Sequence, residues 1–384
     1  MEVLWNSLAK LEWQQVVMWV IGGILIYLAI KRKMEPALLL PMGFGAILVN
    51  IPGTGVLDQE VGGLPTAGII EWLYEIGIEA SEAMPLLLFI GIGAMIDFGP
   101  LLSNPKLLFF GAAAQIGIFV TIVLASLLNV WFPSLGFDIK EAACIGIIGA
   151  ADGPTSILVA NIFKSQNIAA IVVVAYSYMA LVPIIQPAAI KLVTTKKERA
   201  IRMEYRPQSV SRTTRILFPI LVTLVAGLVA PVSLSLVGFL MFGNLLRECG
   251  VLDNLSESAS KVLANLVTLL LGITIAFSMQ ADRFLTVQTL IIMALGLFAF
   301  FIDTIGGVFF CKFLNLFSRK KINPMIGAAG ISAFPMSARV VQKLGLEADP
   351  TNHLLMHAVG ANVAGQIGSV VAGGLILSLI GGII

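Results

Sequence analysis

Long, unbroken apolar runs are the feature that most constrains what this chain can fold into. Such runs cover residues 107–131 and 285–311, for example, and a membrane-spanning helix needs roughly 20 apolar residues. Charged residues make up only 12% of the 384 residues. A soluble domain carries about 25% charged residues, so this chain lacks the charge to cover a globule of its size. The runs also lack the alternation of polar and apolar residues found in lipid-facing barrel strands. An all-α polytopic membrane protein is therefore predicted.

Two other classes are excluded by charge and cysteine content. The formal net charge is only +2, so no general basic field exists and no nucleic-acid partner is expected. Three cysteines, Cys144, Cys249 and Cys311, lie far apart in apolar surroundings. This spacing favours neither a disulfide framework nor a metal cluster.

The first apolar run ends in Lys31-Arg32-Lys33 and is predicted to be a retained span rather than a cleaved signal.

The apolar runs predict about ten membrane spans. They lie at 16–30, 36–50, 84–99, 107–131, 168–190, 215–232, 233–246, 262–280, 285–311 and 353–380. Two further segments, 142–164 and 322–343, are moderately apolar but rich in Gly, Pro, Ser and Asn. Each of them either crosses the membrane once or enters it and returns.

The distribution of basic residues favours re-entrant hairpins at both of these segments. Cytoplasmic loops of membrane proteins carry an excess of Lys and Arg. With both segments re-entrant, all of the 24 Lys and Arg residues fall on the cytoplasmic side except Lys10, Lys140, Lys164 and Arg283. An acidic stretch that includes Asp58, Glu60 and Glu71 falls on the outer side, as do both termini. Residues 191–214 become a basic, solvated cytoplasmic linker.

This arrangement predicts two repeats of opposite orientation. Residues 1–190 form the first membrane repeat with the hairpin 142–164, and residues 215–384 form the second with the hairpin 322–343. The sequence Ile-Gly-Ala-Ala occurs in both hairpins, at 148–151 and at 326–329. Four such residues also occur by chance in apolar helices, so this motif alone does not establish a repeat. Secondary transporters built from inverted repeats bind ions near mid-membrane, where broken helices meet.

Asp152, Gly153 and Pro154 in the first hairpin are the strongest candidates for ion chemistry. An aspartate inside an apolar segment is costly and marks a functional site. Gly and Pro interrupt a helix, and the interruption frees backbone carbonyls beside the carboxylate. Carboxylate and carbonyl oxygens suit a hard cation such as Na⁺, or a proton. The alternative is that Asp152 only caps the second half of the hairpin.

Other polar residues of the membrane segments have weaker assignments. Asn323 and Ser332 in the second hairpin offer neutral oxygens, or they cap turns. Arg339 follows Pro335 and either neutralises a carboxylate or anchors the hairpin at the interface. Asn362 and Gln366 in the last span need polar partners. Asp97 is placed at the cytoplasmic boundary, His353 and His357 are interpreted as polar packing rather than a metal pair, and Asp303 is left unassigned.

Two segments carry a family resemblance. GAADGPTSI at 149–157 and NPMIGAAGISAFPMSARV at 323–340 resemble the signature segments of the membrane β subunit of biotin-dependent, sodium-pumping decarboxylases. That family acts on oxaloacetate, methylmalonyl-CoA, glutaconyl-CoA or malonate. GIGAMIDFGPLL at 91–102 and GANVAGQIGS at 360–369 agree with it, and the resemblance runs nearly end to end.

The resemblance implies a mechanism and assigns residues to it. The β subunit would decarboxylate carboxybiotin presented by a carrier, consume a proton and drive Na⁺ outward. The catalytic residues implied are Asp152, Tyr178, Ser332 and Arg339. Those implied to bind Na⁺ are Asp152, Tyr178, Asn323, Ser332 and Asn362. Those implied to shape the site are Gly153, Pro154 and Gly327.

The resemblance also implies partners and a location. No Ala-Met-Lys-Met biotin attachment motif occurs, so biotin is expected on a separate carrier. A soluble carboxyltransferase, a small single-span subunit and a homo-oligomer are expected, in the cytoplasmic membrane of a prokaryote.

The alternative function is an ion-coupled secondary transporter of a small solute without decarboxylase activity. A channel or structural subunit is disfavoured, because a lone aspartate between broken helices suits an occluded site.

Overall fold

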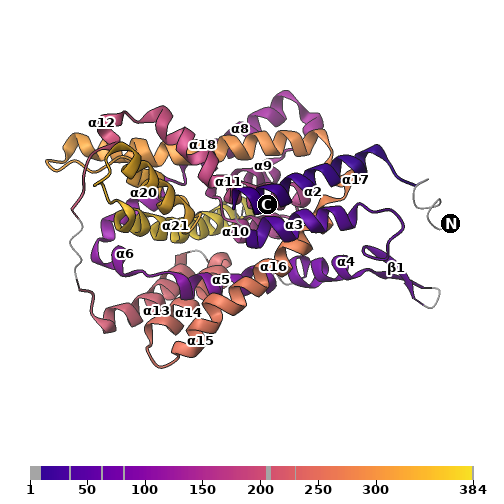
Figure 1. Ribbon diagram of the computed structural model, residues 1–384, viewed down its shortest axis with the longest axis horizontal. Coiled ribbons are helices and arrows are strands. Elements are labelled where there is room, and N and C mark those ends of the chain that lie inside the picture. The colour runs from indigo at the N-terminus through magenta and orange to yellow at the C-terminus, as the bar shows by residue number, and fades with distance from the viewer. Residues whose placement is uncertain are drawn as a thin grey trace.

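A computed structural model describes residues 10–33, 36–61, 64–80, 83–204, 209–229 and 231–382. The ends of both predicted repeats, 1–9 and 383–384, and part of the predicted linker, 205–208, lie outside these residues. The long helices run roughly along the longest axis of the molecule, with the short helix α12 near one end and the strand β1 near the other (Figure 1). The end near α12 is called here the linker end, and the end near β1 is called the β1 end.

The elements of the first half of the chain are as follows. Its helices are α2 (Trp13–Arg32), α3 (Pro36–Val49), α4 (Ile69–Tyr74), α5 (Ala83–Met95), α6 (Gly99–Ser103), α7 (Leu108–Ala113), α8 (Ile116–Trp131), α9 (Ile139–Gly146), α10 (Gly153–Ile162) and α11 (Ile168–Val193). A π-helical turn, η1 (Glu75–Glu79), follows α4, and the 3-10 segments are η2 (Pro105–Leu107), η3 (Pro133–Leu135) and η4 (Ile147–Ala150). The strands are β1 (Asp58–Val61) and β2 (Leu64–Ala67).

The second half contains only helical elements among the described residues. These are α12 (Lys196–Arg199), α13 (Arg212–Val229), α14 (Leu234–Glu248), α15 (Asp253–Glu257), α16 (Ala264–Ile275), α17 (Ala281–Phe284), α18 (Val287–Phe317), α19 (Met325–Ala328), α20 (Met336–Ala348) and α21 (Leu355–Gly381). The shorter segments are η5 (Pro231–Ser233), the π-helical η6 (Ser258–Leu263) and η7 (Ala276–Met279).

Within the described residues, six helical stretches are long and apolar enough to cross a membrane. They are Trp13–Arg32, Pro105–Trp131, Ala170–Val193, Asp253–Met279, Val287–Phe317 and Leu355–Gly381. A seventh span results if Ile69–Glu79 and Ala83–Met95, which are bent by 64°, form one broken helix. Helices also occupy the predicted spans 36–50, 215–232 and 233–246, as α3, α13 and α14, without meeting the same length and apolarity. The fold is that of an all-α polytopic membrane protein.

One antiparallel pair of strands departs from the all-α prediction. Asp58 pairs with Ala67 and Gln59 with Thr66, so the acidic outer stretch predicted as a loop contains a β-hairpin. Alternation in these few residues was too short to indicate strands.

The interior of the bundle contains the segments predicted as hairpins. Helix α10 is buried from Gly153 to Ala160, and α21 contributes a buried face that runs from Ala358 to Ile380. Helix α18 packs against α8, α11, α19 and η4, and α21 packs against α7 and α20. Large apolar side chains such as Trp13, Val130 and Leu228 are exposed on the outside. An apolar exterior is what a lipid-facing surface requires, since lipid does not drive these side chains inward.

Candidate ion-binding site

The first predicted hairpin folds back on itself. A carboxylate oxygen of the buried residue Glu141, at the start of α9, accepts hydrogen bonds from Ser165 Oγ at 2.8 Å and from the Asn167 amide at 3.1 Å. These two residues follow α10. Both ends of the segment therefore meet at one end of the bundle, as a re-entrant hairpin requires.

The second predicted hairpin also begins and ends at one place. Asn323 Nδ2 donates to the carbonyls of Arg199 and Ile201 at 2.8 and 2.9 Å. Asn352 Nδ2, which follows α20, donates to the same two carbonyls at 3.0 and 3.2 Å. The segment 323–352 therefore begins and ends beside the same two linker residues.

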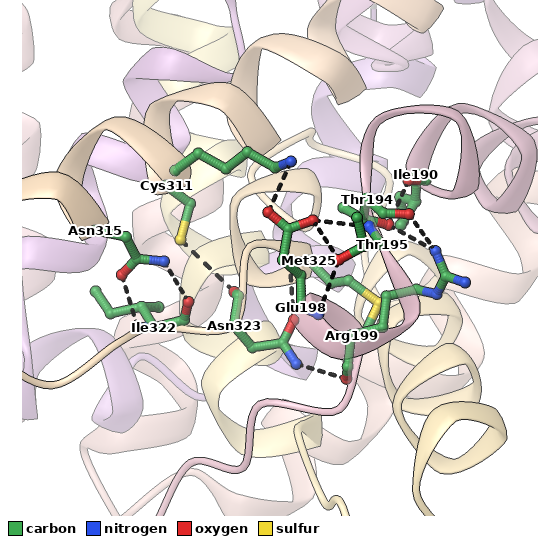
Figure 2. Close-up of polar contacts among 11 residues, drawn as sticks. Ile190, Thr194, Thr195, Glu198, Arg199, Cys311, Asn315, Ile322, Asn323 and Met325 are labelled. Atoms are coloured by element: carbon green, nitrogen blue, oxygen red, sulfur yellow. Dashed lines mark hydrogen bonds and ion pairs between the residues drawn. The ribbon is translucent and has the colours of Figure 1, made fainter.

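The start of the linker is docked rather than free. Thr195 caps α12 and exchanges hydrogen bonds with Glu198, and Lys312 of α18 lies 2.8 Å from the Glu198 carboxylate. Figure 2 shows Thr195 and Glu198 near Asn323. Burial acts to raise the pKa of Glu198, but hydrogen bonds from Lys312 and Thr195 outweigh it, so the pKa lies below its usual value. The predicted solvated linker is thus tied to α18 and the second hairpin at its first residues.

The tips of the two hairpins touch. The Ala150 carbonyl accepts hydrogen bonds from the Ser332 amide at 3.2 Å and from Ser332 Oγ at 2.8 Å. Ala151 adopts a left-handed conformation with φ of 53°. This conformation costs about 1 kcal/mol or more for a residue with a Cβ. The contact with Ser332 helps to hold the chain in this conformation immediately before Asp152.

Asp152 lies at the point where the first hairpin is broken. It caps α10, accepting from the Thr155 amide at 3.4 Å, and its Oδ2 accepts from Thr155 Oγ1 at 2.7 Å. Ser369 Oγ of α21 donates to the same oxygen at 2.7 Å. The side chain is buried, and no Lys or Arg of the described residues forms a salt bridge with it. A buried carboxylate without a cationic side chain is suited to binding a cation.

One face of α21 supplies the rest of the site. Asn362, Gln366 and Ser369 are four and three residues apart, so they share a helical face. Asn362 Nδ2 donates to the Ile331 carbonyl at 2.6 Å, and Gln366 Nε2 donates to the Ser332 carbonyl. Polar partners for Asn362 and Gln366 were expected from the sequence. The structure finds them in the tip of the second hairpin.

Two buried oxygens at this site have no hydrogen-bond partner in the described structure. They are Asn362 Oδ1 and the hydroxyl of Tyr176. The Tyr176 ring lies against Gly153, where an added Cβ would come within 2.3 Å of it. With the carboxylate and hydroxyls around Asp152, the set contains only hard oxygen ligands, which fit Na⁺. No group of three His, Cys, Asp or Glu side chains that could hold a metal ion occurs in the described residues.

The structure brings together some of the predicted residues and separates others. Asp152, Ser332 and Asn362 converge, and Gly153 and Pro154 form the first turn of α10 beside them. Gly327 packs directly against Gly307 of α18. The Tyr178 hydroxyl donates to the Met293 carbonyl of α18, whereas Asn323 and Arg339 lie toward the linker end.

Ser369, Gln366 and Tyr176 were not among the predicted site residues. The helical spacing from Asn362 to Ser369 was a usable signal for the first two. No sequence signal distinguishes Tyr176 from Tyr178, since both lie in the same apolar helix.

Arg339 lines a cavity of about 360 Å³ between α11 and α20. The charged residues around it are Lys33, Lys191, Arg339, Lys343 and Glu347. Only Glu347 is acidic, and it is paired with Lys191 at 3.1 Å. The cavity is therefore suited to an anionic group.

Asp97 and His353 have ordinary polar partners. Asp97 lies 3.5 Å from Arg215 and 3.9 Å from Arg247. His353 Nδ1 lies 3.4 Å from Gln342 Nε2. The place of Asp97 at the cytoplasmic boundary and the packing role of His353 stay predictions.

The fold and the site together define a class. This is a polytopic membrane protein in which two broken helical segments meet beside a buried carboxylate that is surrounded by oxygen atoms. The family described as the Na⁺-transporting oxaloacetate decarboxylase beta subunit matches residues 14–380, and the chain belongs to this family.

Curated relatives cover nearly the whole chain. It is 49% identical over 378 residues to the glutaconyl-CoA decarboxylase subunit beta of Acidaminococcus fermentans, covering 98% of this chain and 96% of the relative. It is 49% identical to the methylmalonyl-CoA decarboxylase subunit beta of Veillonella parvula, covering 95% and 92%. It is 44% identical to the oxaloacetate decarboxylase beta chain of Klebsiella pneumoniae, covering 95% of each.

Proposed function

We propose that this protein is the membrane subunit of a sodium-translocating decarboxylase. It decarboxylates carboxybiotin presented by a carrier protein, consumes a proton and couples the reaction to outward Na⁺ transport. The observation that carries the proposal is Asp152. Its buried carboxylate contacts Thr155 from the first hairpin and Ser369 from α21, at the point where the two hairpin tips touch. Family membership favours this function over a plain secondary transporter.

The proposed architecture has about ten spans in two inverted repeats, 1–190 and 215–384, joined by the linker 191–214. It is supported by the two hairpins, whose ends meet at different places. The first is closed by Glu141 away from the linker, and the second is closed at the linker carbonyls of Arg199 and Ile201. Alternating access would follow from movement of the hairpins relative to the surrounding helices.

Within this architecture, Na⁺ is the transported substrate and binds at Asp152, Ser332 and Asn362. The Asp152 carboxylate supplies the charge, and the unpartnered Oδ1 of Asn362 supplies a neutral ligand. Tyr178 and Asn323 complete the proposed set of ligands. In the described conformation they contact α18 and the linker, so they reach the ion only after the hairpins move.

Arg339 is proposed to receive the carboxyl group of carboxybiotin in its basic cavity. Carboxybiotin supplies the carboxylate that is released as CO₂. The guanidinium of Arg339 orients that carboxylate through charge-assisted hydrogen bonds. Ser332, Tyr178 and Asp152 belong to the coupling machinery between this cavity and the ion site.

Several subunits are needed for this function. The name of the family as a beta subunit implies a complex. The partners proposed are a biotin carrier, a soluble carboxyltransferase, a small single-span subunit and further copies of this chain. The location proposed is the cytoplasmic membrane of a prokaryote.

The test is decarboxylation of the carboxylated carrier by the complex purified from its native membrane. We expect CO₂ release that requires Na⁺, because the ion site and the reaction are coupled. If the carrier is demonstrably present and carboxylated but no CO₂ is released, the function is that of an ordinary ion-coupled transporter.

Replacing Arg339 by Ala should weaken binding of the carboxylated carrier. Loss of one charge-assisted hydrogen bond corresponds to roughly a tenfold or larger rise in KM. The measurement is the KM for the carboxylated carrier in the purified complex. Lys320→Ala is the matched control, because Lys320 lines a separate cavity of about 760 Å³ at the linker end. A larger effect from Lys320→Ala would move the carboxylate site to that cavity.

A further inference from the structure

Asp303 is a second buried carboxyl group inside the bundle. It lies in the middle of α18 with no exposed surface. Its Oδ1 accepts a hydrogen bond from the Gly117 amide. Gly117 belongs to the first turn of α8, where the long helical stretch Pro105–Trp131 is interrupted after α7. One oxygen of Asp303 therefore satisfies an amide that the interruption leaves free.

The other oxygen of Asp303 faces the first hairpin. Oδ2 has no hydrogen-bond partner in the described structure. A Cβ built at Gly149 would lie 2.6 Å from it, so the carboxyl group sits directly against the backbone of the hairpin tip. The next residue, Ala150, carries the carbonyl that binds Ser332, and Asp152 follows two residues later. Asp303 thus contacts the segment that forms the ion site.

An ionised carboxylate in this position would be uncompensated. Burying a charge without a partner costs several kcal/mol. The titratable residues on α18 and on the elements packed against it are, within the described residues, Lys140, Glu141, Cys144, Asp152, Tyr176, Tyr178, Lys191, Cys311 and Lys312. None of them forms a salt bridge or hydrogen bond with Asp303. An Asn would accept from Gly117 equally well without any charge, so capping alone does not explain an aspartate.

We propose that Asp303 is a proton-binding site of the translocation machinery and carries a proton on Oδ2 in this conformation. When the hairpin tip moves away from α18, water reaches Oδ2 and the O–H bond breaks. The electron pair stays on Oδ2, and the proton leaves to water. In the reverse step, Oδ2 of Asp303 takes a proton from water and the O–H bond forms again. This inference rests on the proposed function for its purpose, since decarboxylation of carboxybiotin consumes a proton.

The proton itself is tested by infrared spectroscopy of the purified complex, recorded in H₂O and in D₂O. A protonated carboxyl group gives a carbonyl stretching band that shifts in D₂O. We expect this band to be lost in Asp303→Asn and retained in Asp253→Asn, because Asp253 is exposed on α15. A band that persists unchanged in Asp303→Asn overturns the proposal. If Asp303→Asn does not yield a monodisperse complex, Asp303→Glu replaces it and should displace the band rather than leave it unchanged.

Participation in turnover is tested by the pH profile of Na⁺-dependent decarboxylation. We expect Asp303→Asn to lower turnover roughly 10²-fold, the low end of what a positioned acid contributes, and to flatten the profile. Binding of ²²Na⁺ should remain, because Asp152 is intact. If neither the pH profile nor the turnover changes in Asp303→Asn, Asp303 does not exchange its proton during turnover. If the wild-type complex releases no CO₂ but shows the infrared band, the proposed function fails and the proton site stands.

Discussion

Replacing Asp152 by Asn is expected to abolish Na⁺-dependent decarboxylation. The substitution keeps the shape of the side chain but removes the negative charge of Asp152 at the hairpin junction. The hydroxyls of Thr155 and Ser369, each 2.7 Å from Oδ2, would then face an amide group. Loss of a residue that merely supports an ion ligand costs up to about 100-fold, so loss of the charged ligand should cost at least that in Na⁺ affinity and turnover.

The control for this variant is Asp253→Asn. Asp253 is exposed in the first turn of α15, so the same chemical change there should leave turnover and ²²Na⁺ binding unchanged. The variant complex must elute like the wild type, which separates loss of the ion site from loss of the fold. Full Na⁺-dependent turnover in Asp152→Asn would show that the ion binds elsewhere.

Adding one methyl group at Gly327 should strongly destabilise the bundle. A Cβ at this position would lie 1.9 Å from the Gly307 carbonyl oxygen, and a Cβ at Gly307 would lie 2.1 Å from the Gly327 carbonyl oxygen. Both neighbours are backbone atoms and cannot rotate away, so α18 and α19 must separate. We expect Gly327→Ala to lose about 3 kcal/mol or more, the upper range for overpacking. Thermal unfolding of the detergent-purified protein measures this loss.

Gly23→Ala provides the matched control. Gly23 lies within the membrane-length helix α2, and an added Cβ there meets no atom within 4 Å. Alanine also favours a helix over glycine by about 1 kcal/mol, so this variant should be neutral or slightly stabilised. Equal unfolding temperatures for the two variants would mean that the close approach of α18 and α19 contributes little to stability.

The prediction of the fold from sequence succeeded where the physical cause is local. Apolar length indicated the membrane class. Asp-Gly-Pro at 152–154 predicted a helix break, and the structure places the start of α10 there. The contacts of Glu141 and of Asn323 bring the ends of each hairpin segment together. The return of both hairpins to their starting side of the membrane stays a prediction from the basic loops. The membrane class and the helix break depend on residues within one segment, whereas the hairpin prediction uses the distribution of Lys and Arg along the whole chain.

The candidate site was predicted only in part. Asp152 was identified because a carboxylate in an apolar segment is conspicuous wherever it points. Ser369 was missed, although it donates to Asp152 from 217 residues away along the chain. A serine in a helix rich in Gly and Ala resembles a packing residue until its neighbour is known. The hydrogen bonds from Asn323 to the carbonyls of Arg199 and Ile201 were also missed. Every residue has a backbone carbonyl, so the sequence does not indicate which carbonyls accept such bonds.

By itself, the sequence determined three things: that this chain is a membrane protein, the position of the helix break at 152–154, and that Asp152 carries the charge at this break. These properties follow from hydrophobicity and backbone propensity, which act over neighbouring residues. Only the tertiary structure decided that Tyr176 lies against Gly153 while Tyr178 bonds to α18, and that Asp303 faces Gly149. Such contacts depend on how each helix is rotated and packed against its partners elsewhere in the bundle. That rotation is set jointly by all of the packed surfaces in the bundle.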